Sequence, residues 1–495
     1  MGILDRYTPT TTQSRTEHNF INQRYAAALG ESGGSFLKPD IESETVYRYG
    51  DGKMKGLTSL SEALDYFKVK GNVTFEHAEK ERLHTPLFVE EKASASTANQ
   101  SAQLTLQDES IAFLSSATSP YGTASYPSGY PNTSNANNTA TIPVRERDQV
   151  EFPDGTKAVV TAVDPVNGTF TVFPTRDGAQ IPAITTDEKI IITGNLQPEG
   201  GDSNKTINGR LLTYRNTMQR LRETVEVTGD AASQIGWVKV KGRNFKGQPQ
   251  DGYLWYLMNL SDSYTRHCND IEMTLLTGEQ ITNQLALDAL GGNTGSTEGA
   301  IPQIESHGNT EGYSTLDYTD LENMVRKLNS EHGSHDNHIW GGFDFITDLN
   351  TAMREDSNLQ NGGIEYARYG DAERINNFGF SGFKINDYNF SYSTMEIFSD
   401  PNALGSEDHK YRGIGIVMPI GNTVSYDSRG DAMDVPSWRI NTLRGPRGIR
   451  FKDDWAYGQF LDNQSDGKDI GKWEMLSQFG LEMFALNRYG LFLKE

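Results

Sequence analysis

One amphipathic segment constrains the fold of this chain more than any other feature of its sequence. Between residues 252 and 278, apolar residues recur at the i, i+3, i+4, i+7 spacing of a helix, and Gly278 supplies a stop. The stripe consists of Tyr253, Tyr256, Leu257, Leu260, Tyr264, His267, Cys268, Ile271 and Leu275. A helix of ~26 residues is ~39 Å long, so the rest of the chain must pack along a rod.

His267 and Cys268 lie on or beside this apolar stripe. A thiol beside an imidazole could serve as nucleophile and base, but such a pair needs a third group that orients the base. No such group is evident in the sequence, which favours a buried structural pair.

Residues 143–197 show the clearest β pattern. Runs of β-branched and aromatic residues at 150–152, 158–163, 169–173 and 189–193 are separated by the turn sequences PDG, DPVNG and TRDG. Short strands at this spacing predict a small barrel or sandwich inserted into the chain.

From residue 301 onward, the pattern changes to alternating helices and strands. Thr319 and Glu322 predict a capping box, and the helix that it begins should bury Leu321, Met324, Val325 and Leu328. A strand is expected at 338–341 and a helix at 345–354, with strands punctuated by glycines after them. Near the end of the sequence, apolar residues occupy odd-numbered positions in almost strict alternation. This alternation predicts a pair of long, half-buried strands in one sheet. These apolar residues are Trp473, Met475, Phe479, Leu481, Met483, Tyr489, Leu491 and Leu493.

The composition excludes several classes of protein. The 495 residues include 45 Lys and Arg against 66 Asp and Glu, a net charge of −21, and 36% are hydrophobic. No apolar run approaches the ~18 residues of a membrane helix, and we expect neither a signal peptide nor a lipid anchor. The acidic balance argues against a dedicated nucleic-acid binder. Cys268 is the single cysteine, so we expect folding in a reducing cytoplasm without intrachain disulfides or a thiolate zinc site.

One stretch, residues 205–246, is locally basic, with nine Lys and Arg against three Asp and Glu. Inside so acidic a chain, this asymmetry predicts a strip that meets an acidic patch on a neighbouring copy. A solvated face and contact with nucleic acid are the alternatives. The candidate contact residues are Arg210, Arg215, Arg220, Arg222, Lys239, Lys241 and Arg243.

Residues 30–34 match the G-x-S-x-G motif of a nucleophile elbow by letter. An elbow needs a strand before Ser32 and a helix after it. Here an Ala-rich helix is expected before Ser32 and an irregular stretch after it, so a catalytic role for Ser32 is disfavoured. The chain contains no G-x-x-x-x-G-K-[ST] sequence, which leaves nucleotide binding unsupported.

Two segments could hold a metal ion. In the first segment, imidazoles and carboxylates are clustered just after the expected end of a helix. The cluster could be a zinc site, or it could be a polar loop that ends the helix. Its side chains belong to Glu331, His332, His335, Asp336 and His338. The residues Asp462, Gln464, Asp466 and Gly467 resemble the start of a calcium loop, but Glu474 falls one residue too late for the last ligand, which favours a turn. We therefore predict neither a metal nor a cofactor, and no catalytic set.

Residues 211–234, LLTYRNTMQRLRETVEVTGDAASQ, carry a family resemblance. This segment resembles the R/N-x-TQ-x-x-R…VEVSGT-A stretch in the major capsid proteins of tailed bacteriophages, which have the Hong Kong 97-like fold. In those proteins the stretch precedes the spine helix, as it precedes residues 252–278 here, and Asp270-Ile271-Glu272 is also similar. EKERLHTPLFVEE and NHIWGGFDFITDLNTAMRED look similar too. Within the family, the length and the insertion at 143–197 look most like the crAss-like phages of gut bacteria.

The resemblance implies an α+β fold with a defined order of parts. These are an N-terminal arm (1–55), the first part of a peripheral domain (56–92), an extended-loop region (93–250) containing the β-rich insertion 143–197, a spine helix with more of the peripheral domain (251–300), an axial α/β domain (301–435) and a returning sheet (436–495). We expect neither cleavage of a preceding domain nor a Lys–Asn crosslink.

The resemblance also implies a structural protein that is not an enzyme. Its copies would form the hexamers and pentamers of an icosahedral head around double-stranded DNA, contacted without sequence specificity. Portal, head-auxiliary and scaffolding proteins would be further partners, with assembly in the host cytoplasm and no membrane. The alternative function is a phage or bacterial surface protein that binds polysaccharide through Tyr388, Tyr392, Trp438 and Trp455, whose rings could stack on sugars.

Overall fold

The computed structural model describes residues 52–80, 84, 86–106, 144–164, 168–185, 188–201, 211–235, 239–244, 248–291, 295–357, 382–406, 409–426, 432–446, 448–458 and 467–495. The chain divides into two compact units. The first comprises Met1–Lys55, Leu221–Glu272 and Arg450–Ser477, and the second comprises Gly56–Arg220, Met273–Ile449 and Gln478–Glu495. Helices and strands occur in both units, which confirms the predicted α+β class.

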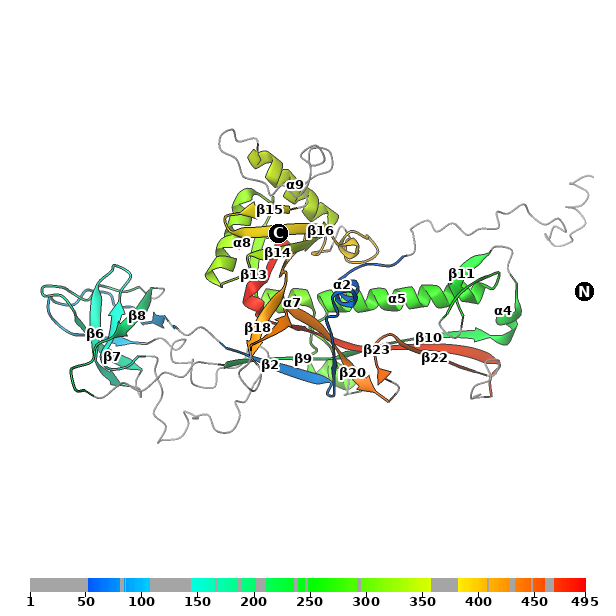
Figure 1. Ribbon diagram of the computed structural model, residues 1–495, viewed down its shortest axis with the longest axis horizontal. Helices are drawn as coiled ribbons and strands as arrows, with labels where there is room; N and C mark the ends of the chain where they lie inside the picture. Colours follow the sequence, from blue (N-terminus) through cyan, green and yellow to red (C-terminus); the bar gives the residue numbers. More distant parts are fainter. Residues whose placement is uncertain are drawn as a thin grey trace, which may run out of the picture. The chain divides into compact units, whose positions relative to one another are not determined.

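In the first unit, helix α5 (Trp255–Thr277) lies along a sheet (Figure 1). The strands follow the order β10 (Gln219–Thr228), β23 (Ile470–Met483) and β22 (Asp453–Gly458). The core between helix and sheet consists of Val227, Leu260, Trp473 and Met475. Helix α5 confirms the predicted rod, but it begins three residues late because residues up to Gly252 belong to a strand.

That strand, β12 (Pro249–Gly252), pairs with β11 (Val240–Arg243) in a two-stranded ribbon. The ribbon packs closely on α5 through Gly242, where a Cβ would lie 2.1 Å from the carbonyl oxygen of Leu257. Only glycine allows this approach. A short helix, α4 (Gly229–Ser233), precedes the ribbon.

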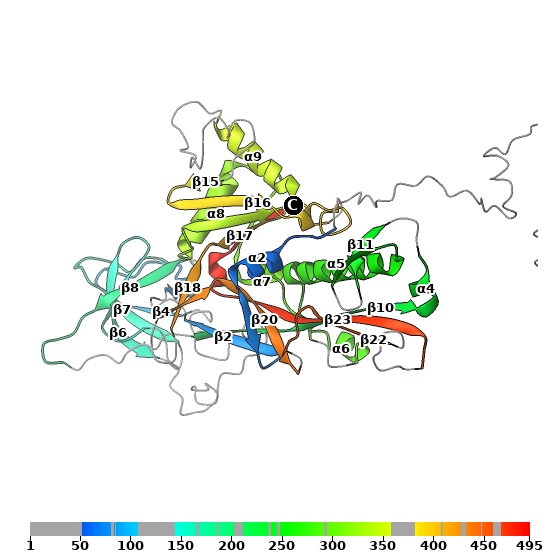
Figure 2. The same ribbon diagram turned by 45° about the vertical axis from the view of Figure 1, so that its right-hand side comes forward.

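The second unit contains a six-stranded mixed sheet with helices packed on it (Figure 2). In spatial order the strands are β13 (Asn309–Tyr313), β24 (Gly490–Lys494), β17 (Gly415–Pro419), β14 (Asp336–Gly341), β16 (Tyr388–Thr394) and β15 (Gly382–Ile385). Helices α7 (Ala300–His307), α8 (Tyr318–Ser330) and α9 (Phe343–Ser357) contact these strands. Strand β14 and helix α9 confirm the strand and helix expected at 338–341 and 345–354.

The N-terminus of α8 differs from the sequence prediction. Asp317 is the N-cap, and its carboxylate accepts a hydrogen bond from the backbone N–H of Asp320 at 3.1 Å. Asp320 completes the box by accepting from the N–H of Asp317 at 3.0 Å. The predicted box of Thr319 and Glu322 is therefore wrong, because a carboxylate caps as well as a hydroxyl and lies two residues earlier. The predicted inward face is confirmed, since Leu321, Met324, Val325 and Leu328 are all buried.

Six short strands of the second unit form a small barrel with its own core. In spatial order they are β3 (Leu87–Phe88), β8 (Lys189–Asn195), β5 (Asp148–Glu151), β6 (Lys157–Asp164), β7 (Thr169–Pro174) and β4 (Ala102–Thr105). A bridge between Val89 and Leu106 joins the two outer strands, and the interior is filled by side chains such as Phe170 and Val150. Strands β5 to β8 confirm the four predicted strands. The barrel also includes β3 and β4. These two strands are too short to give a recognisable β pattern in the sequence.

The remaining elements of the second unit include three further strands that continue from β23, and two ribbons. Strand β1 (Phe67–Lys70) pairs in parallel with β20 (Trp438–Gly445), which is antiparallel to β23 and to the short β21 (Gly448–Ile449). The ribbons are β2 (Thr74–Lys80) with β9 (Leu211–Thr217), and β18 (Asn422–Tyr426) with β19 (Ala432–Pro436). The short helices are α2 (Leu57–Leu64), α6 (Gln284–Ala289) and two 3-10 turns, Glu396–Phe398 and Leu486–Arg488. Of the helices that the structure describes, none is long and apolar enough to span a membrane.

The C-terminal pair of strands is confirmed only in part. Strand β23 is 14 residues long, but its second half is buried on both faces instead of one. The last strand, β24, is short and lies in a different sheet from β23. The left-handed conformation of Ala485 and the 3-10 turn after it redirect the chain between the two sheets.

Candidate assembly site at the base of the β2–β9 ribbon

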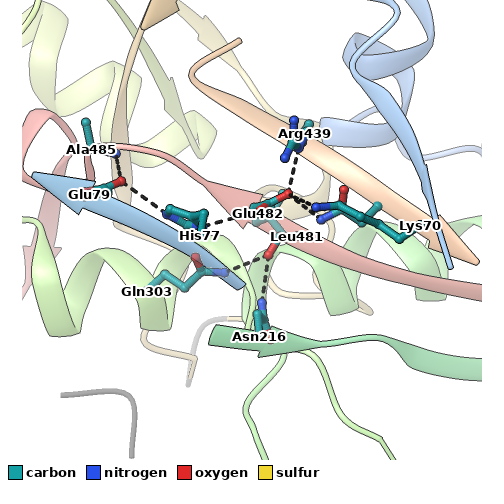
Figure 3. Close-up of polar contacts among 10 residues, drawn as sticks. Lys70, His77, Glu79, Asn216, Gln303, Arg439, Leu481, Glu482 and Ala485 are labelled. Carbon is teal, nitrogen blue, oxygen red and sulfur yellow. Dashed lines mark hydrogen bonds and ion pairs between the residues drawn. The ribbon is translucent and has the colours of Figure 1, made fainter. Parts of the chain in front are cut away.

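The ribbon of β2 and β9 is a hairpin-like pair formed by segments far apart in the sequence. Its register pairs Thr74 with Thr217 at one end and Lys80 with Leu211 at the other. Side chains alternate along β2, so that Phe75, His77 and Glu79 share one face and are less exposed than their neighbours. This face meets the charged group drawn in Figure 3.

Glu482 of β23 is the centre of this group, and it is only 2% exposed. Its Oε2 accepts hydrogen bonds from Arg439 Nε and Asn441 Nδ2, both at 2.7 Å, and lies 3.4 Å from Lys70 Nζ. A buried carboxylate is tolerated only when it is paired and hydrogen-bonded in this way. Strands β1, β20 and β23 are therefore tied together at one carboxylate.

His77 connects the ribbon to the same carboxylate. Its Nδ1 lies 3.4 Å from Oε1 of Glu482, and its Nε2 lies 3.2 Å from Oε1 of Glu79. Glu79 in turn accepts a hydrogen bond from the backbone N–H of Ala485 at 2.6 Å. The ring also packs on Phe484 with a centroid distance of 4.7 Å. One imidazole thus holds β2 against the end of β23.

Burial alone would lower the pKa of His77, but its contacts with Glu482 and Glu79 raise that pKa above the ordinary value. Burial alone would raise the pKa of Glu482, but His77, Arg439 and Asn441 hold it well below its ordinary range. The stabilisation from His77 is therefore complete below its unfolded pKa and is lost as the pH rises through its folded pKa. The stabilisation from Glu482 is present above its unfolded pKa and is lost only as the pH falls through its lowered folded pKa.

The amide of Asn216 fixes the other strand of the ribbon, and the amide of Gln303 shares its two acceptors. Asn216 of β9 donates from Nδ2 to the carbonyl oxygens of Leu481, at 2.8 Å, and of Glu298, at 3.0 Å. Gln303 donates to the same two carbonyls at 3.4 and 2.7 Å. Both strands of the ribbon are thus attached at their base, β2 through charges and β9 through backbone hydrogen bonds.

The cavity beside this group has a volume of about 10 Å³ and is lined by residues that include His77, Asn216 and Glu298. That space fits one water molecule and no organic substrate. Burial and the charge of Glu279 raise the pKa of Glu298 to about 7. Because the polar side chains around the cavity mainly contact one another, the arrangement is suited to hold elements in place and not to transform a substrate.

The basic residues singled out in the sequence lie on several strands. Arg210 lies outside the described residues. Arg215 lies on the exposed face of β9, with its Nε 3.6 Å from Glu76 Oε1. Arg220 is exposed on β10, and Arg222 of the same strand contacts Glu474 at 3.1 Å.

The other three basic residues lie on or beside β11. Lys239 lies 3.9 Å from Asp251, and Lys241 is exposed. The guanidinium of Arg243 lies 3.8 Å from the ring centroid of Tyr264, a cation–π contact that fastens the ribbon to α5. Contact between this basic set and a neighbouring copy stays a prediction.

His267 and Cys268 of α5 have separate surroundings. His267 is 2% exposed, and its Nε2 lies 2.8 Å from the hydroxyl oxygen of Ser477. Burial, with a smaller effect of Lys452, lowers the pKa of His267 to about 4. Cys268 is half-buried. The structural interpretation is confirmed for His267, which hydrogen-bonds to Ser477 and points ~100° away from its neighbour around the helix.

The histidine segment joins α8 to β14 as the predicted polar loop. His338 of β14 lies between two serines, with Nδ1 2.7 Å from Ser391 Oγ and Nε2 2.9 Å from Ser393 Oγ. Burial lowers the pKa of His338 to about 4. Among the residues that the structure describes, no three His, Cys, Asp or Glu side chains gather closely enough to hold a metal ion. Ser32 and residues 462–466 lie outside the described ranges.

Two of the four aromatic residues proposed for sugar binding are buried. Tyr388 and Trp438 are each 4% exposed and belong to the interior. The hydroxyl of Tyr392 donates to Asn350 Oδ1 at 2.7 Å. Two of the four rings therefore have no free face for a sugar, which weakens the polysaccharide alternative.

Comparison with known proteins gives low similarity. No protein-family model matches the chain, and no curated protein matches it. Among solved structures, the chain is similar to one from Microbacterium phage Oxtober96, with 9% identity and a TM-score of 0.38, over 96% of this chain and 100% of that one. It is also similar to the "Capsid of native GTA particle computed with C5 symmetry", with 6% identity and a TM-score of 0.37, over 94% and 97%. A third is the "Capsid structure of the Cyanophage P-SCSP1u", with 10% identity and a TM-score of 0.32, over 61% and 81%. Its structural neighbours thus include capsid proteins, at TM-scores that do not by themselves assign a role.

Proposed function

We propose that this chain is a shell-forming structural protein, the major capsid protein of a tailed bacteriophage with the Hong Kong 97-like fold. The β2–β9 ribbon is the observation that carries the proposal. Within the described residues it has two strands only, and neither outer edge is paired. A two-stranded ribbon alone is at best marginally stable in water. A ribbon that is fixed at its base and open at its edges is suited to be completed by another copy of the chain.

The sequence supports the same proposal. Residues 211–234, which resemble the capsid-protein stretch, form β9, β10 and α4, and the β11–β12 ribbon and helix α5 follow them. In this proposal the copies form hexamers and pentamers of an icosahedral virion shell around double-stranded DNA, after assembly in the host cytoplasm. Portal, head-auxiliary and scaffolding proteins are further partners, and the chain has no catalytic role. The domain ranges given above and the relationship to crAss-like phages stay predictions.

Electron microscopy and sedimentation velocity of the concentrated protein test this function. We expect closed shells for the unaltered chain. Ala78→Trp, on the exposed face of β2, should leave folded protomers and few shells, because a bulky ring obstructs a neighbour that packs on the ribbon. Thr161→Trp, at an exposed strand position of the barrel, is the matched control and should still form shells. A monomer of 55.0 kDa at every concentration would contradict the proposal.

A further inference from the structure

In the first unit, helix α5 packs on one face of the sheet, and no other described helix of that unit is known to cover the opposite face. On β10, Val225 and Val227 face the helix, so that Arg222 and Glu226 lie on the opposite face. On β23, Trp473 faces the helix, which places Lys472 and Glu474 on that opposite face as well. Arg222 and Glu226 are 58% and 53% exposed there, whereas Lys472 and Glu474 lie deeper and are 15% and 14% exposed.

These four charged side chains form two ion pairs. The cation belongs to β10 in one pair and to β23 in the other. Arg222 of β10 contacts Glu474 of β23 at 3.1 Å, whereas Lys472 of β23 contacts Glu226 of β10 at 2.8 Å. Charge therefore alternates along each strand and also across the two strands. We call this set of Arg222, Glu226, Lys472 and Glu474 the charge square.

Aromatic side chains of β22 flank the charge square. Trp455 lies opposite Glu474, and Tyr457 lies opposite Lys472 in the register of β22 and β23. The hydroxyl of Tyr457 donates to Glu474 Oε1 at 2.7 Å, and Lys472 Nζ lies 5.8 Å from the centre of the Tyr457 ring. Arginine, tyrosine and tryptophan are the residues that carry most of the binding energy in protein interfaces.

A charge square of this kind is complementary to itself. Half a turn about an axis that runs parallel to the strands, just outside this face, brings a second copy opposite the first with its two rows exchanged. Each positive group then faces a negative group of the second copy. A rotation of this type relates the two halves of an isologous dimer, in which both copies use the same surface. A polyanion such as DNA would instead meet the carboxylates of Glu226 and Glu474 together with the cations.

We propose that this face of the β10–β23–β22 sheet is a two-fold contact between copies of the chain, with the charge square facing its own image and Trp455 and Tyr457 packed beside it. The proposal deepens the shell function and rests on it, because it names one symmetric contact through which shell subunits meet. Pairing of opposite charges sets the register and the partner of such a contact.

Reversal of all four charges tests the contact without breaking the ion pairs inside the chain. The variant Arg222→Glu, Glu226→Lys, Lys472→Glu, Glu474→Arg keeps both pairs in reversed direction. We expect it to associate with itself as the unaltered chain does. Mixed with the unaltered chain, it should give heterodimers at least tenfold less often than random pairing, because every charge then faces its like. Native mass spectrometry of isotope-labelled mixtures measures this fraction.

Two further variants test the contact without the four simultaneous substitutions: one is a control and the other is a single substitution. Glu322→Arg with Arg326→Glu reverses an exposed ion pair on α8 and should mix freely with the unaltered chain. Thr224→Arg places a bulky cation between Arg222 and Glu226 on the exposed side of β10 without removing a partner, and should weaken self-association at least tenfold.

Random mixing of the reversed and unaltered chains, or no effect of Thr224→Arg, would overturn the two-fold contact. If such mixtures still build shells, the shell function stands and only this contact fails. If the folded, unaltered chain never self-associates, the shell function fails as well. Binding of DNA or of a glycan that Thr224→Arg abolishes, without loss of self-association, assigns the face to that ligand and contradicts the proposal.

Discussion

The imidazole of His77 lies between two carboxylates, 3.4 Å from Glu482 and 3.2 Å from Glu79. Glu482 belongs to β23 and Glu79 to β2, so one ring fastens the ribbon to the sheet beside it. Glu482 is also bonded to Arg439 and Asn441 of β20. The orientation of the ribbon therefore depends on a few buried charges, whose removal should be measurable.

Replacement of Glu482 by Gln should lower the free energy of unfolding by ~3–5 kcal/mol, because the cations beside it stay buried without a counter-charge. Urea denaturation of dissociated protomers measures this loss. Glu322→Gln is the matched control, since Glu322 forms an exposed pair with Arg326 and should cost less than ~0.5 kcal/mol. Equal losses in the two variants would show that the buried cluster does not fix the ribbon.

The ribbon should detach as the pH rises, because the pKa of His77 is raised by the two carboxylates. Its stabilising contribution is fully present below its unfolded pKa and is lost as the pH increases through the folded value. Hydrogen exchange of β2 and β9 between mildly acidic and alkaline pH follows this loss. The His77→Gln variant should show low protection in the ribbon at every pH. An unaltered chain whose ribbon protection is independent of pH would speak against this role for His77.

Gly242→Ala should destabilise the first unit by ~2 kcal/mol or more, because the added methyl group meets the backbone of Leu257, which cannot move aside. The control is Gly194→Ala in β8, where a Cβ meets nothing within 4 Å and the backbone is not left-handed. That change should be neutral or slightly stabilising. Thermal unfolding of both variants provides the comparison, and a similar melting temperature for the two would contradict the close packing of β11 on α5.

Phe170→Ala should cost ~3–5 kcal/mol, since the ring is fully buried in the barrel core. Because the barrel has a core of its own, the loss of protection from hydrogen exchange should be confined to strands β3 to β8. Protection of α8 and β14 should be unchanged. A loss of protection that spreads evenly over the chain would indicate that the barrel does not fold as a separate unit.

Local patterns in the sequence were sufficient for the long helix and for the strands of the barrel. The apolar spacing along 252–278 and the turns between 150 and 193 act over a few residues, and they recur in α5 and β5 to β8 almost unchanged. The two-residue strand β3 and the bridge from Val89 to Leu106 left no such pattern, because they exist only when the barrel closes. The position of the capping box is a related case, since Asp317 and Thr319 are both residues that cap helices well and only the structure shows that Asp317 is the N-cap.

Glu482 leaves a signal in the sequence. It is a single carboxylate within the apolar run at the end of β23, and a charge in such a position must be buried with partners. His77 offers no signal, because it lies within the charged segment FEHAEKER. The charge square is equally hidden, since Arg222 and Glu474 are distant in the sequence and become neighbours only across β10 and β23.

The sequence by itself determined the long helix, the strands of the barrel with a clear β pattern, the net charge and the single cysteine, because these depend on residue types and on spacings within one segment. The tertiary structure alone decided which strands close the barrel, which partners surround Glu482, and which charged side chains pair across β10 and β23. These features depend on contacts between segments tens to hundreds of residues apart, and the free energy of such contacts is set by burial and distance in the folded chain.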